Sequence, residues 1–389
     1  SIIDLACGHQ PMVSSCGQVA LVQNGEIYNY LELRNDLKEL GCKFETNSDT
    51  EVLLQGYMTW GLDIVHRLTG MFGIAIWDER SGELHIIRDA LGVKPMFLCE
   101  SVDRVFFGSE IKAILAAGVD RKVSDEALHH FLSYGFVPPP YTLFQGIRHL
   151  MPGWGATISD GGISEWQWWK PAKTEQRSIG ESEFCDQFVG LLEESVRLRM
   201  RSDVPFGAFL SGGLDSSSVV GLMGRFTDQP VKTFSIGFHD ERFDESMWGR
   251  MASERFGTDH HVEFVGPEIV HKWVRAVYHC DQPHSDVSFL PTMRLSELAV
   301  QHVKMALTGD GGDELFGGYT KYTGYFAKNG LNQPLEEFVA GYHKHITLFS
   351  EDEKHVLYSG TQSAKVKDLN SIDVSRHWLE QVPHFDRIS

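Results

Sequence analysis

Over roughly the first 155 residues, hydrophobic positions come in short runs separated by polar turns, the pattern of β-strands. The runs predict strands at 19–22, 72–77, 84–88 and 104–107. Two stretches with apolar residues at helical spacing lie among them, at 30–40 and 49–58. Ser48 precedes the second as an N-cap, with Glu51 as its capping-box partner. Strands flanked by helices in this way predict an α+β domain built in layers.

From about residue 181 the pattern changes to alternating helices and strands. The periodicity predicts helices at 182–199, 216–226, 245–256 and 291–301, and strands at 204–210, 231–238, 262–265 and 303–307. This alternation predicts an α/β doubly wound parallel sheet, which binds ligands at the carboxyl ends of its strands. We therefore expect domains at 1–155 and 181–389. A junction and linker at 156–180 connects them, and the polar stretch 172–179 is the linker proper.

Composition narrows the function classes. The 389 residues carry 35 basic and 53 acidic side chains, a net charge of −18, which argues against nucleic acid or a membrane surface as a partner. The longest apolar runs are too short to span a bilayer and no signal peptide opens the chain, so we expect a cytoplasmic protein. Six cysteines without a Cys-x-x-Cys pair indicate neither a zinc site nor a disulfide framework. The oligomeric state stays open, a homodimer included.

The stretch Leu210-Ser211-Gly212-Gly213-Leu214-Asp215-Ser216-Ser217-Ser218 lies between a buried-type strand and a helix. Its glycines allow a ligand close to the backbone, and the helix amides and the hydroxyls of Ser211, Ser216 and Ser217 suit an anion such as phosphate. Asp215 would repel phosphate unless a cation intervenes, so it indicates Mg²⁺. A plain surface turn is the alternative, which the flanking strand and helix disfavour. The Gly-Lys-Ser/Thr ending of a γ-phosphate loop is absent.

Two further segments follow predicted strands. Phe234-Ser235-Ile236-Gly237-Phe238 would place backbone groups near an adenine. Leu307-Thr308-Gly309-Asp310-Gly311-Gly312-Asp313 continues through Glu314-Leu315-Phe316-Gly317-Gly318-Tyr319 as an acidic, glycine-rich loop. It lacks the Asp-x-Asp-x-Asp-Gly spacing of a calcium loop. Placed opposite the serine-rich loop, Asp313 can share Mg²⁺ with Asp215 and neutralise a leaving pyrophosphate.

These motifs resemble known ones. SGGLDSS resembles the pyrophosphate loop of ATP-pyrophosphatases, which leaves argininosuccinate, GMP, NAD and asparagine synthetases as alternatives. TGDGGDELFGGY is similar to the SGEGADELFGGY motif of asparagine synthetases and selects that family. The resemblance implies that Ile236, Gly237 and Gly309 contact ATP, and that Asp310 acts at the acyl-adenylate and the arriving amine. Asp310 stands where many members have Glu, and Asp281-Gln282-Pro283 differs from a frequent Asp-Glu-Pro.

In the first half an ordered set of motifs occurs. These are Gly8-His9-Gln10-Pro11-Met12, Asn24-Gly25-Glu26-Ile27-Tyr28-Asn29, Asn47-Ser48-Asp49-Thr50-Glu51, Gly70-Met71-Phe72-Gly73, Arg88-Asp89-Ala90-Leu91-Gly92-Val93-Lys94-Pro95 and Gly108-Ser109-Glu110-Ile111-Lys112-Ala113. Alone, Asn24-Gly25 also suits a hairpin turn. Together they resemble the class II glutamine amidotransferase domain, a layered glutaminase of the N-terminal-nucleophile type. The resemblance implies that Asn24 and Gly25 form the oxyanion hole and that Asn24, Glu26 and Asp49 bind glutamine.

In that family the nucleophile is an N-terminal cysteine whose own α-amine is the base. Here the chain begins at Ser1 in a strand-like stretch and ends at Ser389 without a tail signature, so we expect a piece cut at both ends, lacking that cysteine and a later lysine. Cys7 and Cys16 are internal and have no free α-amine, so we interpret both as ordinary side chains. This polypeptide is therefore not expected to hydrolyse glutamine.

The resemblance implies a glutamine-hydrolysing asparagine synthetase that uses ATP and Mg²⁺. Aspartate would attack the α-phosphorus of ATP to give β-aspartyl-AMP and pyrophosphate, and ammonia derived from glutamine would then capture the adenylate. Three alternatives remain. The first is an enzyme that amidates another carboxylate. The second is an enzyme of the β-lactam synthetase type, which the Asn24 cluster and Asp49 disfavour, and the third is a non-catalytic nucleotide-binding relative.

Overall fold

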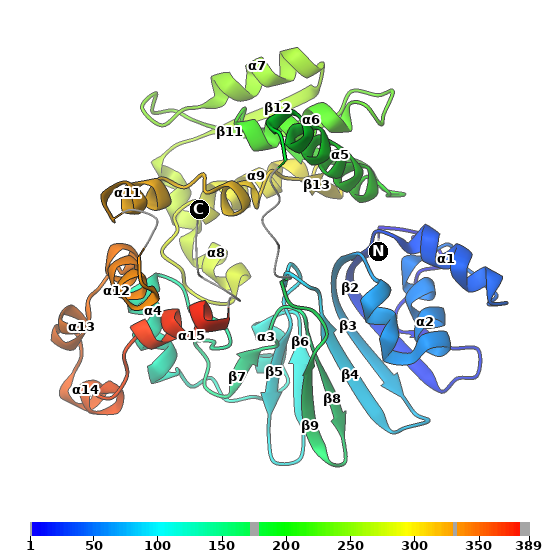
Figure 1. Cartoon of the computed structure of the whole chain (residues 1–389), viewed down its shortest axis with the longest axis horizontal. Helices are drawn as coiled ribbons and strands as arrows, with labels where there is room; N and C mark the ends of the chain where they lie inside the picture. The colour runs from blue at the N-terminus through cyan, green and yellow to red at the C-terminus, as the bar shows by residue number, and fades with distance from the viewer. Residues whose placement is uncertain (1, 172–178, 330–332, 382–389) are drawn as a thin grey trace.

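Two antiparallel sheets packed face to face form most of the first domain in the computed structural model, which describes residues 2–171, 179–329 and 333–381 (Figure 1). The larger sheet has the order β1-β2-β3-β4-β8-β9 and the smaller one the order β6-β5-β7. The larger sheet consists of Met12–Val13 (β1), Val19–Ile27 (β2), Gly70–Asp78 (β3), Glu83–Arg88 (β4), Trp154–Ser159 (β8) and Gly162–Gln167 (β9). The smaller sheet consists of Phe97–Glu100 (β5), Val105–Gly108 (β6) and Ile147–His149 (β7).

Helices cover the outer faces of these sheets. On the larger sheet, α1 (Tyr30–Glu39) and α2 (Asp49–Trp60) bury their apolar faces against β2 and β3. On the smaller sheet, α3 (Ile111–Ala116) does the same. The short helix η1 (Gly61–Arg67) follows α2, and α4 (Asp125–Tyr134) follows α3. The predicted layered α+β domain is confirmed by these layers.

The start of α2 was predicted only in part. The Ser48 side chain accepts a hydrogen bond from the Glu51 amide at 3.1 Å, as expected of an N-cap. The Glu51 carboxylate does not close a capping box. It accepts instead from the amides of Glu45 and Thr46, at 2.8 and 2.7 Å, because the chain before the helix folds back over it.

The first sheet continues beyond the predicted boundary at residue 155. That residue lies inside β8, which pairs with β4, and β9 pairs with β8 in turn. Trp168 then stacks on Phe72, with ring centroids 6.0 Å apart, and its indole N–H donates to the Arg88 carbonyl at 3.1 Å. We therefore propose that the first domain ends near residue 169. The predicted linker at 172–179 lies almost wholly outside the described residues.

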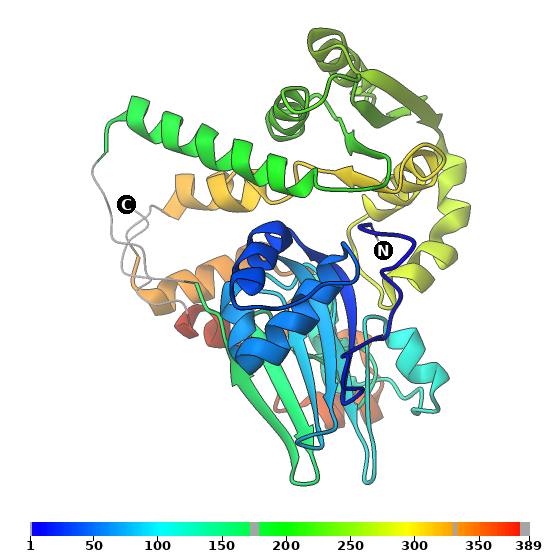
Figure 2. The ribbon, with the colours of Figure 1, turned by 90° about the vertical axis from the view of Figure 1, so that its right-hand side faces the viewer.

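The second domain is built on four parallel strands in the order β12-β11-β10-β13. These strands are Phe206–Phe209 (β10), Lys232–Phe238 (β11), Asp259–Val265 (β12) and Met305–Leu307 (β13). Three helices, α5 (Glu181–Arg199), α6 (Leu214–Met223) and α7 (Ser246–Phe256), pack toward one face. The other face is covered by α9 (Phe289–Ala299), as Figure 2 also shows. Helices on both faces of a parallel sheet confirm the predicted doubly wound fold.

Several element ends differ from the prediction for local reasons. The helix expected at 216–226 begins at Leu214, because Gly213 is its N-cap, and ends before Gly224, a poor helix former. The helix expected to begin at Pro291 begins two residues earlier, because proline is tolerated in the first turn. The strand expected at 303–307 begins at Met305, the first residue that pairs with β10.

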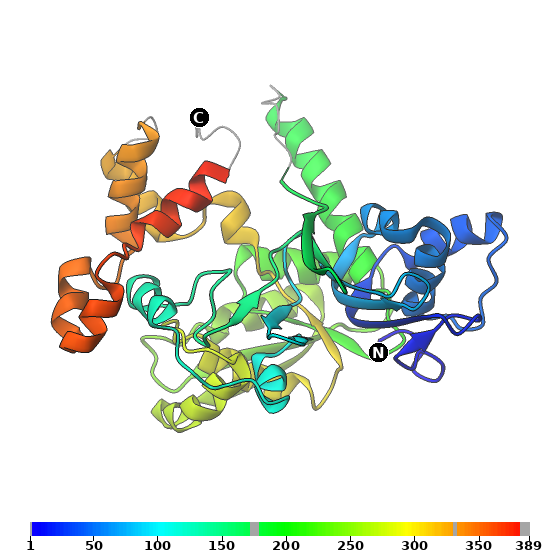
Figure 3. The same cartoon turned by 90° about the horizontal axis from the view of Figure 1, so that it is seen from below.

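Further helices lie outside the predicted set. They are η2 (Pro267–Lys272), α8 (Trp273–Cys280), α10 (Gly312–Phe316), α11 (Thr320–Asn329), α12 (Leu335–Ile346), α13 (Glu351–Leu357), α14 (Gly360–Val366) and α15 (Ile372–Gln381). From below, α12 to α15 form an arm beyond α4 (Figure 3). Over the described ranges, no helix is both long and apolar enough to cross a membrane.

The loop after α8 ties the two domains together. Asp281 has a positive φ of 64°, and its carboxylate accepts from the Ile111 amide at 2.7 Å and pairs with Lys112 Nζ at 2.8 Å. Gln282 Oε1 accepts from the Leu143 amide at 2.7 Å. Glutamine can therefore stand in place of the frequent glutamate here, because this contact needs only an acceptor oxygen, which both side chains have.

Candidate active sites

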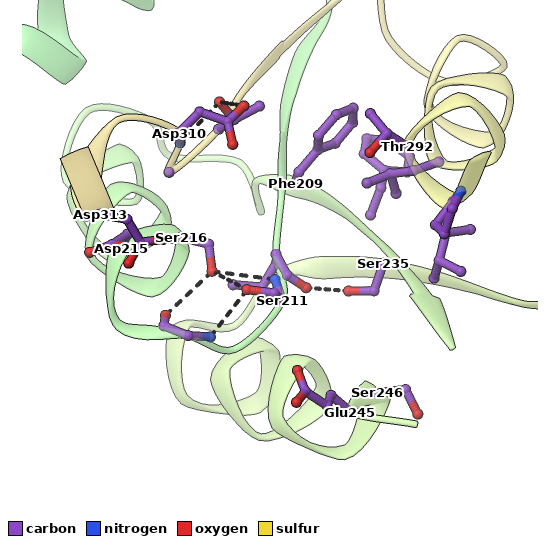
Figure 4. Close-up of a pocket in the computed structure, with 18 of the residues that line it drawn as sticks. Phe209, Ser211, Asp215, Ser216, Ser235, Glu245, Ser246, Thr292, Asp310 and Asp313 are labelled. Atoms are coloured by element: carbon purple, nitrogen blue, oxygen red, sulfur yellow. Dashed lines mark hydrogen bonds between the residues drawn. The ribbon is translucent and has the colours of Figure 1, made fainter. Parts of the chain in front are cut away.

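The loop after β10 is held in shape by its own serines. The hydroxyls of Ser211 and Ser216 lie 3.0 Å apart, and the Gly213 amide donates to Ser211 Oγ at 3.2 Å (Figure 4). Ser216 Oγ also donates to the Gly213 carbonyl at 3.3 Å. The first turn of α6 begins at once, and its amides have no acceptor within the helix. This is the arrangement that binds phosphate.

The loop rests on α7 by direct backbone contact. Gly212 has a φ of 84°, and a Cβ there would lie 2.2 Å from the carbonyl carbon of Trp248. A Cβ on Gly249, the next residue of α7, would lie 3.0 Å from the Leu210 carbonyl oxygen. Both positions therefore need glycine for close approach.

The acidic loop after β13 packs against Asp215. A Cβ on Gly309 would lie 2.9 Å from the Asp215 Cβ, and one on Gly312 would lie 2.5 Å from its carboxyl carbon. Asp313 follows directly, on the same side of the pocket as Asp215 (Figure 4). Asp310 Oδ2 accepts from the Thr308 hydroxyl at 2.9 Å. The structure thus brings together the three acids that the sequence placed in two distant loops.

One cavity of about 570 Å³ collects most of the predicted nucleotide residues. Its lining includes Leu210, Ser211, Gly213, Asp215, Ser216, Ile236, Gly309, Asp310 and Asp313. Three predicted residues are not part of that lining. Gly212 faces α7, the Ser217 amide donates to the Gly213 carbonyl at 3.0 Å inside the helix, and the Cα of Gly237 is covered by Phe264 and Asp244.

Other residues of the lining were missed by the sequence analysis. Pro291, Thr292 and Leu295 reach the cavity from α9, and Tyr319, the last residue of the acidic loop, also lines it although it was assigned no role. Tyr319 donates to Glu314 at 2.6 Å, which raises its pKa to about 12. No local motif marks the α9 residues, because they arrive by the crossover between β12 and β13.

The two aspartates fit a magnesium ion bound together with phosphate. Mg²⁺ is typically held by one or two carboxylates plus phosphate oxygens and water. Within the part of the chain that the structure describes, no group of three or more His, Cys, Asp or Glu side chains could hold a metal ion without further ligands. Asp215 and Asp313 would thus supply two ligands and depend on a nucleotide for the rest.

The Asn24-Gly25-Glu26 cluster lies within β2, so the alternative of a hairpin turn is wrong. Asn24 pairs with Gly73 and Gly25 with Phe72 on β3. Gly25 has a φ of 148°, and a Cβ there would lie 2.0 Å from the Met71 carbonyl oxygen. Pairing with a distant strand therefore overrides the local turn preference of Asn-Gly.

The cluster contains one buried carboxylate, Glu26, and a second, Asp49, lies next to it. Glu26 is 4% exposed, and among the described residues its Oε1 has no hydrogen-bond partner. Burial, together with the charge of Asp49, raises the pKa of Glu26 to about 7. Asp49 accepts from Gln23 Nε2 at 2.8 Å and from the Ile27 amide at 3.0 Å, and burial raises its pKa too. An unpaired buried carboxylate suits a cationic ligand.

The internal cysteines have ordinary surroundings. Cys7 is exposed in a turn, and its amide donates to Asp4 Oδ1 at 3.2 Å. Cys16 is also exposed, and its pKa is lowered chiefly by a hydrogen bond with Ser14. The rejection of both as glutaminase nucleophile stays a prediction.

Comparison with known proteins identifies the family. Residues 1–169 match the family described as Glutamine amidotransferase domain, and residues 187–381 match the one described as Asparagine synthase. The chain belongs to the asparagine synthase family. The two matches follow the order predicted for this family, with the layered domain first and the doubly wound domain second.

Some individual relatives of this chain are named asparagine synthetases, and others are named amidases. Asparagine synthetase (glutamine-hydrolyzing) 1 of Bacillus subtilis is 37% identical over 323 residues, which are 83% of this chain and 51% of that protein. Amidase chry2 of Gibberella zeae is 29% identical over 380 residues, 92% of this chain and 55% of that one. The chain thus spans about half the length of these curated relatives. A solved glutamine phosphoribosylpyrophosphate amidotransferase from B. subtilis aligns at a TM-score of 0.32 and 18% identity, over 65% of this chain and 48% of that one.

Proposed function

We propose that the cavity of the second domain binds MgATP and activates aspartate for amidation to asparagine with glutamine-derived ammonia. The observation that carries this proposal is the meeting of the serine-glycine loop after β10 with the acidic loop after β13. In the order β12-β11-β10-β13, the chain leaves β10 toward β11 and returns to β13 on the other side of β10. Ligands bind at such a switch point in open α/β sheets.

The proposed chemistry divides among the lining residues. The amides at the start of α6 and the hydroxyls of Ser211 and Ser216 bind the phosphates. An aspartate carboxylate oxygen then attacks the α-phosphorus, and pyrophosphate leaves with the bridging oxygen. When bound, Mg²⁺ held by Asp215 and Asp313 neutralises charge on the phosphates.

Amide formation completes the reaction. Ammonia forms a bond to the carbonyl carbon of the acyl-adenylate, AMP leaves with its oxygen, and the nitrogen loses one proton. Asp310 lines the cavity, and the Thr308 hydroxyl orients its carboxylate. A carboxylate held in this way can take the proton from the nitrogen.

In the first domain we propose that Glu26 and Asp49 hold the α-ammonium group of glutamine. The unpaired Glu26 Oε1 supports this assignment. Asn24 and the Gly25 amide would stabilise the oxyanion of glutamine hydrolysis, a contribution of about 3 to 4 kcal/mol for one donor.

Exchange of labelled pyrophosphate into ATP, with and without L-aspartate, tests the synthetase half. We expect exchange that depends on aspartate. Exchange that depends on another carboxylic acid would mean that this acid, and not aspartate, is the substrate. Two observations favour this alternative: the amidase name of the G. zeae relative, and Asp310 at a position where many family members have Glu. Exchange without any acid would contradict the proposal, and binding of MgATP without exchange would indicate a nucleotide-binding relative.

A further inference from the structure

A network of buried and half-buried polar side chains runs beneath the phosphate-binding loop, between the parallel sheet and α7. It joins Ser253, Thr258, Thr233, His260 and Ser235 to the backbone carbonyl of Leu210. Thr258 Oγ1 lies 2.9 Å from Ser253 Oγ and 2.8 Å from Thr233 Oγ1. His260 Nδ1 lies 2.9 Å from Thr233 Oγ1, and its Nε2 lies 3.5 Å from Ser235 Oγ.

This polar face is unusual for its position. A sheet face under a helix normally carries apolar side chains, and buried hydroxyls are costly unless they are hydrogen-bonded. Thr233 is fully buried and Ser235 is 6% exposed, on the face of β11 that α7 covers. Each hydroxyl among these five side chains has a hydrogen-bond partner, so they form a connected network rather than a set of isolated polar atoms.

The network ends at the residue before the loop. The Leu210 amide donates to the Phe234 carbonyl at 2.9 Å, and the Leu210 carbonyl accepts from the Ser235 hydroxyl. Figure 4 shows this second bond next to Ser211. Leu210, the residue before Ser211, is therefore held through both its amide and its carbonyl by neighbouring residues of β11.

We propose that Ser235, backed by His260, is a positioning residue that sets the orientation of the phosphate-binding loop; this inference rests on the nucleotide site proposed above. The Ser235 hydroxyl has one proton and donates it to Leu210. His260 Nδ1 contacts Thr233 Oγ1 and its Nε2 contacts Ser235 Oγ, so the ring connects Ser235 to the rest of the network. Burial lowers the pKa of His260, which favours the neutral ring.

The position of His260 makes the inference testable. Ser235 lines the cavity, so its hydroxyl could also touch a ligand directly. His260 is not part of that lining, and it reaches the loop only through Ser235 and the backbone of Gly249, where a Cβ would lie 3.6 Å from Nε2. An effect of His260 on phosphate binding would therefore be transmitted through the loop.

Calorimetric titration of the full chain with MgATP and with magnesium pyrophosphate tests the inference. We expect Ser235→Ala and His260→Ala each to weaken pyrophosphate binding about tenfold, the loss typical of one buried hydrogen bond. His260→Gln keeps an N–H donor and should recover part of the affinity. Thr258→Val removes a half-buried hydroxyl on the side of the same network away from the loop, and should lower the melting temperature while binding stays within about twofold.

The outcomes separate the explanations. Equal losses in all variants, Thr258→Val included, would indicate a general loss of packing and contradict the inference. A loss confined to Ser235→Ala would indicate direct ligand contact and also contradict it. Circular dichroism checks that each variant folds. If His260→Ala does not fold, the pyrophosphate affinities of His260→Gln and Ser235→Ala decide between these explanations. Wild-type protein that binds neither ligand would overturn the proposed nucleotide site itself, and this inference with it.

Discussion

Carboxylates stand at both candidate sites, buried in the first domain and accessible to solvent in the second. Glu26 on β2 and Asp49 at the start of α2 are only 4% and 6% exposed, and one oxygen of Glu26 has no hydrogen-bond partner in the part of the chain that the structure describes. In the second domain, Asp215 and Asp313 are partly exposed in the first turns of α6 and α10, and Asp310 is exposed in the loop after β13.

The difference indicates two kinds of cation. A buried, rigid carboxylate has already lost its water, so it selects a compact organic cation such as an ammonium group that fits its fixed geometry. Exposed carboxylates on glycine-rich turns keep water, which suits Mg²⁺ because that ion dehydrates reluctantly and shares its shell with phosphate. The carboxylates of the first domain are therefore suited to an organic cation, and those of the second domain to a hydrated metal ion.

The largest expected effect comes from removing the accessible acids. Asp215→Asn or Asp313→Asn should lower the rate of ATP–pyrophosphate exchange by about a thousandfold, because each substitution removes a ligand of the ion that neutralises the phosphates. Both positions are open to solvent, so the melting temperature should change little. Exchange rates measured over a range of Mg²⁺ concentrations check this prediction.

Asp228→Asn is the matched control. Asp228 is exposed after α6 and is not part of the cavity lining, so its substitution should leave exchange unchanged. If Asp228→Asn lowered the exchange rate as much as Asp215→Asn, the effect would come from the change in net charge and not from the loss of a metal ligand.

In the second domain, the sequence predicted the residues of the phosphate-binding loop better than the residues that other elements bring to the same cavity. Ser211, Gly213 and Ser216 act through local bonds in one short turn, so the motif carries the geometry with it. Thr292 arrives from α9 across a crossover, and nothing in its local sequence reveals that path. In the first domain, local preference alone would have given the wrong structure, because Asn24-Gly25 favours a turn but pairs with β3.

The second expected effect concerns the buried acid and pH. Glu26 has a pKa of about 7 in the folded protein and an ordinary value of 4.5 when unfolded, so the folded state binds its proton more tightly. Its contribution to stability is complete below pH 4.5 and is lost as the pH rises through 7. Glu26→Gln should therefore be more stable than wild type at pH 8, by on the order of 2 kcal/mol, and nearly equal to it at pH 4. Thermal melts from pH 4 to pH 8 measure this.

Glu39→Gln is the control for that series. Glu39 is exposed at the end of α1, so its variant should follow the wild-type pH profile. L-glutamine should raise the melting temperature of wild type more than that of Glu26→Gln at pH 8. An unchanged pH slope in Glu26→Gln would show that the buried carboxylate does not govern this region.

The smallest expected effect concerns one of the contacts that join the two domains. Asp281 binds the Ile111 amide and Lys112 across a separation of 170 residues, which no sequence motif reveals. Asp281→Ala should lower the free energy of unfolding by about 1.5 kcal/mol, because it leaves the first amide of α3 without its acceptor and removes the better buried partner of Lys112. Asp281→Asn keeps an acceptor and tolerates the positive φ, so it should cost less than half as much. Urea unfolding distinguishes them, and equal stability of both variants with wild type would show that this contact does not hold the domains together.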